Sequence, residues 1–297
     1  MKRTQYFKQP EFIPIFTDYS HFFGKSIGIT GQHGILGGIL SERLISHNIR
    51  VEAYPFDVTD AETLNDWFNK YNFDYFFHFA AIVPVSQVML DPLKAYRVNV
   101  IGSFNICNQI IENQPNSWLF LASSSHVYRG SPISEEQQIL KVGFAEAPDS
   151  FYGVTKLVAE QISRPILDQH KANYCIGRIF SFSSIAQKEP HLIPTLRRKI
   201  SEMAPSDVLE IINPDSIRDI MDAETVIDCL LYLAQNKFEG TLNIGSGKGM
   251  RILDIAYHIM ELLGKKNQIR GVNKSLPNTF VADVDTLMQV VSEKRRL

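Results

Sequence analysis

Cysteine is scarce in this sequence, and its three cysteines, Cys107, Cys175 and Cys229, stand far apart. They form no CxxC pair and no cluster with histidine, which argues against a disulfide framework and against a structural zinc site. We therefore expect no metal, and reduced thiols of the kind found in cytoplasmic proteins.

Long hydrophobic runs and an excess of one charge are also lacking. No apolar stretch approaches the ~18 residues of a membrane span, and the basic N-terminal residues precede no continuous apolar core of a signal peptide. Lysine and arginine number 30 against 32 aspartates and glutamates, so the net charge is −2. This balance argues against nucleic acid as a partner. We expect a folded cytoplasmic protein without membrane insertion.

What is present is an alternation of apolar runs and helical segments. The predicted strands cover 26–30, 51–54, 75–80, 118–122 and 174–180, and the predicted helices cover 36–46, 61–70, 92–112 and 152–169. Continuous apolar strands separated by helices predict a parallel sheet covered on both faces. The expected fold is therefore an α/β, doubly wound Rossmann sheet.

The alternation becomes irregular after residue 180. Helices are predicted over 193–203, 224–236 and 252–263, and strands over 208–212 and 241–244. These pieces are too interrupted for a second full sheet and predict a smaller C-terminal substrate-binding lobe over the carboxyl edge of the first sheet. The expected division is an N-terminal arm (1–24), a cofactor-binding domain (25–180, with a returning segment near 208–244) and the lobe (181–207 and 245–297).

A glycine turn, GxxGxxG, joins the first strand to the first helix. Gly31 permits a tight turn, Gly34 lets the backbone approach a pyrophosphate, and Gly37 lets the helix lie close to the strand. Free N–H groups and the helix dipole then favour phosphate. The predicted cofactor contacts in this turn are Gly31, His33, Gly34, Ile35, Leu36 and Gly37.

The preference between NAD and NADP is less defined. An acidic residue at the end of the second strand would favour NAD, but the stretch 51–55 ends without one. Because His33 could contact a 2′-phosphate, we favour NADP, with NAD as the open alternative.

Tyr152 and Lys156 stand four residues apart on a predicted helix, so their side chains share one face. A phenol with its ordinary pKa of about 10 is a poor base at neutral pH. A neighbouring ammonium, with a nicotinamide cation nearby, favours the phenolate, so we expect the two charges to lower the pKa of Tyr152. Tyr152 could then take a proton from a sugar hydroxyl as the cofactor takes a hydride.

Further motifs occur in order along the chain. They are Asp57-Val58, His78-Phe79-Ala80-Ala81, Asn99, Ser123-Ser124-Ser125-His126-Val127-Tyr128, Tyr152-Gly153-Val154-Thr155-Lys156, Arg218-Asp219 with Asp222, and Asn243-Ile244-Gly245-Ser246-Gly247. With the glycine turn, and over about residues 25–287, they resemble the extended short-chain dehydrogenase/reductase family of nucleotide-sugar epimerases, dehydratases and reductases.

The resemblance implies roles for individual residues. Its cofactor contacts are Asp57, Val58, Ala80, Ala81, Asn99, Tyr152 and Lys156. Ser124 matches the hydroxyl that hydrogen-bonds the reacting sugar oxygen, with Ser123 and Ser125 as competing choices. Ser125 is also expected to contact substrate. His126 stands where relatives carry a proton-transferring residue, and its role stays open between catalysis, substrate contact and neither.

Two arginines resemble the family's substrate-binding residues. Arg218 is suited to clamp a nucleotide diphosphate, unless it forms a salt bridge with Asp219 or Asp222. Arg178 begins a segment like the family's Arg-Pro-x-Asn, although Ile179 and Ser181 replace the proline and asparagine. The resemblance implies Arg178 and Ser181 as substrate contacts, with a serine hydroxyl in place of the family's asparagine amide.

The short segment between the second strand and Asp57 resembles sugar 4-keto reductases. The leading hypothesis is an NAD(P)-dependent enzyme that reduces or oxidises C4 of a nucleotide-activated (6-deoxy)hexose, for surface polysaccharide, lipopolysaccharide or deoxysugar biosynthesis. The alternatives are an epimerase at C4, or at C3 or C5 with His126 as acid/base, or a dehydratase, each of which retains its cofactor, and a catalytically silent cofactor sensor. The family likeness also implies a homodimer formed through 92–112 and 152–169.

Overall fold

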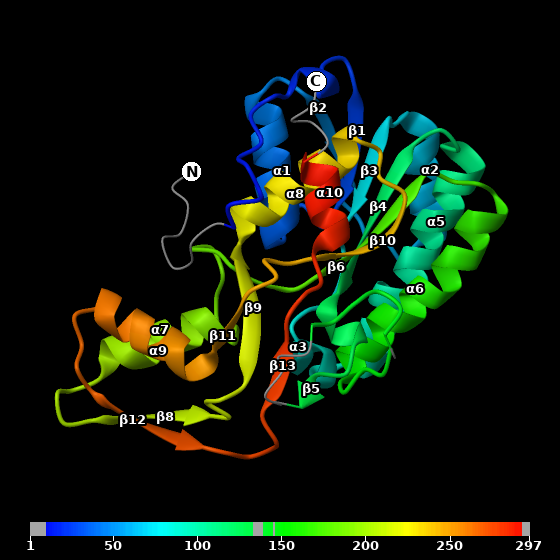
Figure 1. Ribbon diagram of the computed structural model, residues 1–297. Coiled ribbons are helices and arrows are strands. Elements are labelled where there is room, and N and C mark those ends of the chain that lie inside the picture. Colours follow the sequence, from blue (N-terminus) through cyan, green and yellow to red (C-terminus); the bar gives the residue numbers. More distant parts are fainter. Residues whose placement is uncertain (1–9, 133–138, 145, 293–297) are drawn as a thin grey trace.

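A six-stranded parallel sheet forms the centre of the computed structural model, which describes residues 10–132, 139–144 and 146–292 (Figure 1). The strands are β1 (Ser26–Thr30), β2 (Arg50–Ala53), β3 (Tyr75–His78), β4 (Trp118–Ser124), β6 (Tyr174–Ile179) and β10 (Gly240–Ile244). Their order is β10-β6-β4-β3-β1-β2, and every pairing is parallel. The order reverses between β1 and β3, where ligands bind in such folds.

Helices cover both faces of this sheet, as the apolar strands predicted (Figure 1). On one face lie α1 (Ile35–Ser46), α8 (Ala223–Gln235) and α10 (Asp285–Ser292), and on the other lie α2 (Ala61–Lys70), α5 (Gly102–Asn113) and α6 (Phe151–Gln169). Each side has its own apolar core: Ile29 and Phe120 pack on the first, and Phe76 and Leu119 on the second. The doubly wound α/β prediction is confirmed.

The helix predicted over 92–112 is one helical run with a wide turn inside it. It consists of α4 (Pro92–Tyr96), a π-helical turn (Arg97–Ile101) and α5. A short helix that the periodicity did not reveal, α3 (Val85–Leu90), precedes it. The wide turn contains Asn99, whose buried side chain is described with the site below.

The C-terminal lobe does contain a second sheet, contrary to the expectation. Short strands from distant segments build it: β7 (Ser181–Ser183), β9 (Ile217–Asp222), β11 (Gly249–Arg251), β13 (Asn278–Phe280) and β5 (Ser131–Pro132). A parallel pair, β8 (Val208–Ile212) with β12 (Gln268–Val272), and two helices, α7 (Leu192–Glu202) and α9 (Ile252–Leu262), complete the lobe. Its separate core includes Leu196 and Ile255.

The segment 208–244 does not return to the main sheet as one piece. β8 and β9 belong to the lobe, and only α8 and β10 lie with the central sheet. Conversely, α10 falls within the range expected for the lobe but packs Leu287 and Val291 into the core of the main sheet. The chain therefore crosses between the two parts more often than expected.

Residues 10–24 lie on the outside of α1 and α8, and residues 1–9 of the predicted arm fall outside the described residues. Phe16 and Phe22 are buried there, and the Phe16 amide donates a 3.0 Å hydrogen bond to Asp228 on α8. Arg43 on α1 donates to the same carboxylate at 2.8 Å. These contacts fix the arm to the main domain.

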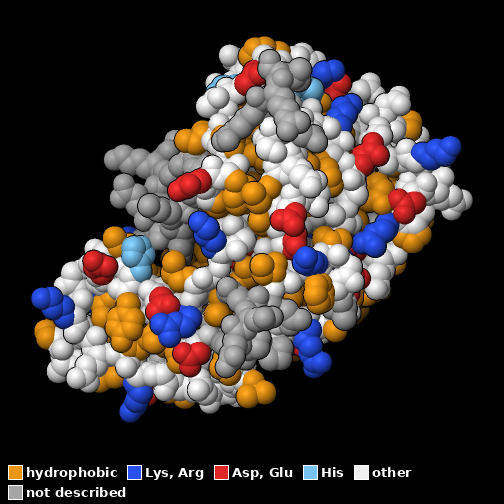
Figure 2. Space-filling model, viewed as in Figure 1, with side chains coloured by type: hydrophobic (Ala, Val, Ile, Leu, Met, Phe, Trp, Pro, Cys, Tyr) orange, Lys and Arg blue, Asp and Glu red, His pale blue; other side chains and the backbone are white. Residues whose placement is uncertain are grey.

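The surface carries both charges in mixture. Figure 2 shows basic and acidic side chains interspersed on the displayed face, in keeping with the net charge of −2. Within the described ranges, no helix has the length and apolar character needed to cross a bilayer.

Candidate active site

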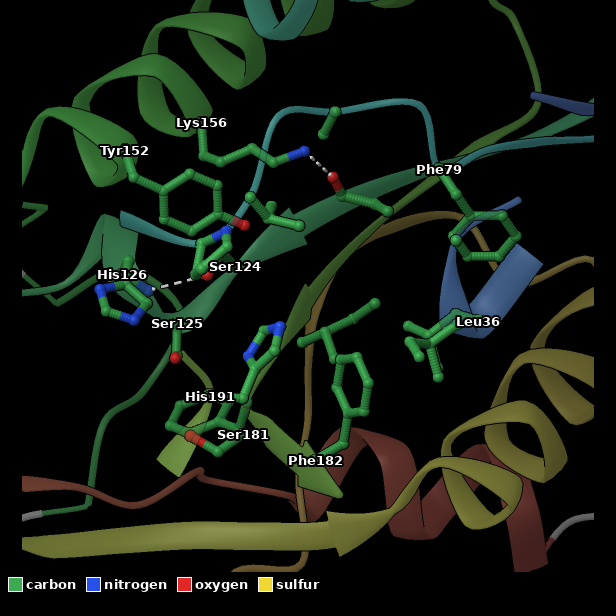
Figure 3. Close-up of a pocket in the computed structure, with 18 of the residues that line it drawn as sticks. Leu36, Phe79, Ser124, Ser125, His126, Tyr152, Lys156, Ser181, Phe182 and His191 are labelled. Atoms are coloured by element: carbon green, nitrogen blue, oxygen red, sulfur yellow. Dashed lines mark hydrogen bonds between the residues drawn. The ribbon is translucent and has the colours of Figure 1, made fainter. Parts of the chain in front are cut away.

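A pocket of about 570 Å³ opens at the carboxyl ends of the parallel strands, between the main sheet and the lobe (Figure 3). The glycine turn and the ends of β3 and β4 form one side, and residues of β7, α7 and β9 face them. Ser124, Tyr152 and His126 lie toward one end, whereas Phe79 and Leu36 lie toward the other. This position at the reversal of strand order is where a dinucleotide fold binds its ligands.

The glycine turn has no room for side chains at two of its positions. Gly31 has a φ of +76°, and a Cβ there would lie 2.7 Å from the Ala80 amide nitrogen. A Cβ on Gly37 would lie 2.4 Å from the Gly31 carbonyl oxygen. Gly34 precedes the first turn of α1, where no side chain caps the helix. The exposed amides and close backbone fit a dinucleotide pyrophosphate.

The predicted cofactor residues fall into two groups. Those that line the pocket are Gly31, Gly34, Ile35, Leu36, Gly37, Ala80, Ala81, Tyr152 and Lys156. His33, Asp57, Val58 and Asn99 are not part of the pocket lining. His33 and Asp57 are exposed on the loops after β1 and β2, and Val58 is buried beside Gly102.

Asn99 has a different place from the one expected of a cofactor contact. It is fully buried, and its amide side chain accepts from the Ile82 amide at 2.7 Å and donates to the Thr155 hydroxyl at 3.0 Å. Because these hydrogen bonds reach Ile82 on one side and Thr155 on the other, Asn99 ties the loop after β3 to α6. Its polar atoms are thus satisfied by protein groups.

The three consecutive serines point to different partners. Ser123 donates to the carboxylate of Glu160, away from Tyr152. Ser124 lies next to the Tyr152 phenol (Figure 3), and its Oγ accepts from the His126 amide at 3.2 Å. Ser125 lines the pocket farther from the phenol (Figure 3). The geometry favours Ser124 as the serine that acts with Tyr152.

Tyr152 and Lys156 come from the first turns of α6, which Ser150 caps by accepting from the Gly153 amide at 3.1 Å. Burial raises the pKa of Tyr152 to about 12, and the hydrogen bond with Ser124 lowers it only in part. Burial lowers the pKa of Lys156 to about 8, and its ammonium donates to the Ala122 carbonyl at 2.7 Å (Figure 3). The expected lowering of the Tyr152 pKa depends also on the charge of a nicotinamide cation, and it stays a prediction.

Two histidines line the pocket. The ring of His126 lies 5.5 Å from the Tyr152 ring, centroid to centroid. Burial, with the charge of Arg218, lowers the pKa of His126, and burial lowers the pKa of His191. Both imidazoles are therefore neutral at pH 7. Sequence reasoning missed His191, since it precedes α7 without any motif around it.

Arg218 and Ser181 enter the pocket from the lobe, on β9 and β7. The Arg218 guanidinium donates to the Asn278 carbonyl at 3.1 Å and lies over the Phe280 ring, 5.2 Å from its centroid. Burial lowers its pKa to about 10, so it stays charged at neutral pH. Asp219 is satisfied elsewhere, by the amides of Ser246, Gly247 and Ala282. This cation is available to an anionic ligand.

Arg178 is not a substrate contact, and the expectation is corrected here. It is fully buried on β6, outside the pocket lining, where its guanidinium meets the carboxylate of Glu160 at 2.6 Å and the Tyr128 hydroxyl at 2.9 Å. The sequence could not reveal this because the partner, Glu160, approaches from α6, and local spacing does not predict a contact between a helix and a strand.

The remaining lining residues carry no sequence signal. They are mostly apolar: Phe79, Val83, Pro84, Val85, Ala122, Ile179, Phe180, Phe182, Gln187, Leu192, Ile193 and Ile220. Among the described residues, the lining includes no aspartate or glutamate. A pocket with two cations and no carboxylate suits a ligand that bears phosphates.

The fold and the site define a dinucleotide-binding α/β protein with a serine, a tyrosine and a lysine at the pocket wall. The model of the NAD dependent epimerase/dehydratase family matches residues 27–245, and the chain belongs to this family.

Known relatives include nucleotide-sugar epimerases. A UDP-glucose 4-epimerase of Mycoplasma genitalium is 29% identical over 270 residues, covering 83% of this chain and 78% of that protein. A UDP-glucose 4-epimerase of Rickettsia prowazekii is 22% identical and covers 77% of this chain, which spans 60% of that relative's length.

Solved structures share the fold. RMD from Pseudomonas aeruginosa, complexed with NADPH, superposes with a TM-score of 0.79 at 20% identity, covering 90% of this chain and 92% of that one. UDP-glucose 4-epimerase of Thermus thermophilus, in complex with NAD, gives 0.77 at 18% identity, covering 89% and 92%. At these identities the likeness shows the fold alone.

Proposed function

We propose that this protein is a nucleotide-sugar 4-epimerase that uses Tyr152 as its only proton-transferring side chain. The observation that carries the proposal is the pairing of Tyr152 with Ser124 beside Lys156, in a pocket whose described lining has no carboxylate. Inversion at C4 needs one acid/base group, because the same hydroxyl loses and regains its proton. Dehydration, or inversion beside a carbonyl, needs a further group to move a carbon-bound proton.

The glycine turn, with Ala80 and Ala81, would hold the dinucleotide, and Lys156 lies where it can reach a ribose. When bound, the nicotinamide ring supplies a hydride acceptor that can also return the hydride. With the charges of Lys156 and of a bound nicotinamide cation favouring its phenolate, Tyr152 would take the proton of the sugar hydroxyl as the carbonyl forms and give it back when the carbonyl is reduced. Ser124 donates a hydrogen bond to the same sugar oxygen.

The substrate we propose is a sugar joined to a nucleoside diphosphate, with uridine favoured by the relatives. Arg218 would bind the diphosphate, because its guanidinium faces the pocket and is charged at neutral pH.

A net C4 reductase is the second candidate. The segment after β2 supports this candidate. β2 is the edge strand of the sheet, and the chain continues from it directly into the loop of Asp57, as in the sugar 4-keto reductases that this segment resembles. The lack of a second acid/base pair does not favour reduction over C4 inversion, since both need only Tyr152. Ser124, Tyr152 and Lys156 in one pocket argue against a catalytically silent role.

We propose NADP as the preferred dinucleotide only on the position of His33, which is exposed at the glycine turn. A larger Kd for NADPH in His33→Ala, with the Kd for NADH unchanged, would support that preference. We also propose a cytoplasmic homodimer formed by α5 and α6, which light scattering at micromolar concentration would test; a monomer would overturn it.

The test of the function combines binding and turnover. Thermal shift with UDP, GDP, dTDP and CDP should identify the nucleotide, because a ligand that binds the folded state raises its stability. The matching sugar nucleotide is then incubated with the protein and NAD or NADP while the absorbance of the reduced nicotinamide is followed. An epimerase forms the C4 epimer with no net absorbance change, whereas stoichiometric gain or loss of absorbance supports the reductase instead.

A further inference from the structure

Behind the candidate site, α6 carries a stripe of polar residues at intervals of four. Tyr152 and Lys156 continue into Glu160 and Arg164, so all four side chains lie along one face of the helix. Glu160 is 3% exposed, although carboxylates are rarely buried without a partner. Its burial calls for a physical reason.

The Glu160 carboxylate has three kinds of partner. The guanidinium of Arg178 meets it through Nε at 3.1 and 3.2 Å and through Nη2 at 2.6 Å. Arg164 approaches at 3.3 Å, and the hydroxyl of Ser123 donates a short hydrogen bond. Ser123 is the residue before Ser124, so this carboxylate holds the end of β4 that presents Ser124 to Tyr152.

Glu160 also shares a small polar cavity with Lys156. Its other polar walls come from His78, Ser103, Ser123 and Ser163, and its volume of about 10 Å³ is room for about one water molecule. A water there would have several polar partners. The cavity therefore has room for one water that could bridge the Glu160 carboxylate and the Lys156 ammonium.

The other titratable groups near Lys156 cannot balance its charge. Burial and the charge of Lys156 lower the pKa of His78 on β3 to about 3, so this imidazole is neutral. Tyr152 is neutral because burial raises its pKa to about 12. On β6, Arg178 is a second buried cation, and its pKa is raised by Glu160 even though burial alone would lower it.

We propose that Glu160 is a positioning residue, whose carboxylate orients Ser124 through Ser123 and keeps Lys156 protonated across a one-water cavity. The proposal rests on the proposed function, because it concerns the group of Ser124, Tyr152 and Lys156. Without Glu160, Lys156 would lose the carboxylate whose charge raises its pKa, whereas Arg178 would keep its ion pair with Glu146. An arginine keeps its proton under these conditions, so Lys156 would be the group to lose one.

The test reads the protonation of Lys156 in the protein without substrate. The lysine side chains are isotope-labelled and titrated by NMR, and Lys156→Met identifies the signal. In Glu160→Gln the pKa of Lys156 should fall by about one unit, a tenfold rise in its acid dissociation constant. Asp168→Asn, which removes a carboxylate from α6 two turns farther on, is the matched control and should leave the pKa unchanged.

Two further variants separate charge from structure. Arg178→Met leaves Glu160 and removes the competing cation, so the pKa of Lys156 should rise. Ser123→Ala removes the hydrogen bond to Glu160, so it should lower kcat about tenfold, the effect expected for roughly one hydrogen bond. The pKa of Lys156 should stay the same.

An unchanged Lys156 pKa in folded Glu160→Gln or Arg178→Met would overturn the electrostatic role. Failure of both variants to fold, together with a parental kcat in Ser123→Ala, would reduce Glu160 to a structural residue and also overturn the proposal. Because the titration uses no substrate, its result is independent of whether the protein is an epimerase. A normal titration with no epimerase activity would count against the proposed function alone.

Discussion

Gly153 follows Tyr152 in the first turn of α6, and it has no space for a side chain. A Cβ at this position would lie 2.1 Å from the carbonyl oxygen of His126 and 2.8 Å from Pro148. Carbon and carbonyl oxygen normally approach to about 3.3 Å, so Gly153→Ala must move the helix start and the segment of His126 apart by about 1 Å. Ser124 belongs to that segment, and Tyr152 to the helix.

The consequence for catalysis can be estimated from this displacement. A misplacement of about 1 Å between reacting groups costs on the order of 100-fold in rate, or about 2.7 kcal/mol in the activation barrier. The overpacking should also cost about 1–3 kcal/mol of stability, offset by about 1 kcal/mol from the better helix propensity of alanine.

The assay is kcat under saturating substrate and cofactor, with urea unfolding to measure stability. Val154→Ala is the matched control, since Val154 is the next residue and is 36% exposed. We expect kcat of Gly153→Ala to fall about 100-fold with the control near the parent. A folded Gly153→Ala variant with parental kcat would refute the reasoning that Ser124 and Tyr152 must keep this spacing.

Three other substitutions test separate parts of the account. Gly37→Ala should weaken dinucleotide binding at least about tenfold, because its Cβ would lie 2.4 Å from the Gly31 carbonyl oxygen. The control Gly38→Ala, whose Cβ would have its nearest neighbour at 3.2 Å, should bind the dinucleotide nearly as the parent does. Equal Kd values for the two variants would contradict this prediction. Tyr152→Phe should keep ligand binding and lose nearly all turnover, and a parental kcat would remove it from the mechanism. Lys156 has its pKa lowered from 10.5 to about 8 in the folded state. The unfolded chain therefore binds more protons between these values, and the parent should gain up to about 3 kcal/mol of stability as pH rises through this window. Lys156→Met should lack that gain when urea unfolding is compared at the two ends of the window, and an equal gain in both proteins would reject the assignment.

Local signals in the sequence were enough to predict much of the main domain. The apolar run of β1 and the helix of α2 have the predicted bounds, and Asp60 caps α2 by accepting from the Thr63 amide at 3.1 Å. These elements depend on hydrophobic periodicity and capping within a few residues. The glycine turn and the Tyr152–Lys156 spacing could be read for the same reason.

The lobe and the surroundings of the site depend on pairings between distant segments. β9 pairs with β13 about sixty residues farther along; β13 has only three residues, and the burial of β9 does not alternate. The prediction of a substrate contact for Arg178 failed because its partner, Glu160, approaches from another element. His191 became visible as a pocket residue only when α7 was placed over the sheet.

In the proposed function, Tyr152 alone moves the proton while a hydride leaves C4 of the sugar and returns to the same carbon. The most direct test uses a UDP-hexose that carries deuterium at C4, with the purified protein and its dinucleotide, followed by NMR and mass spectrometry. We expect the C4 epimer to form with the label still at C4, and Tyr152→Phe to abolish this product. Deuterium found in the released reduced cofactor, with no labelled epimer, would contradict it.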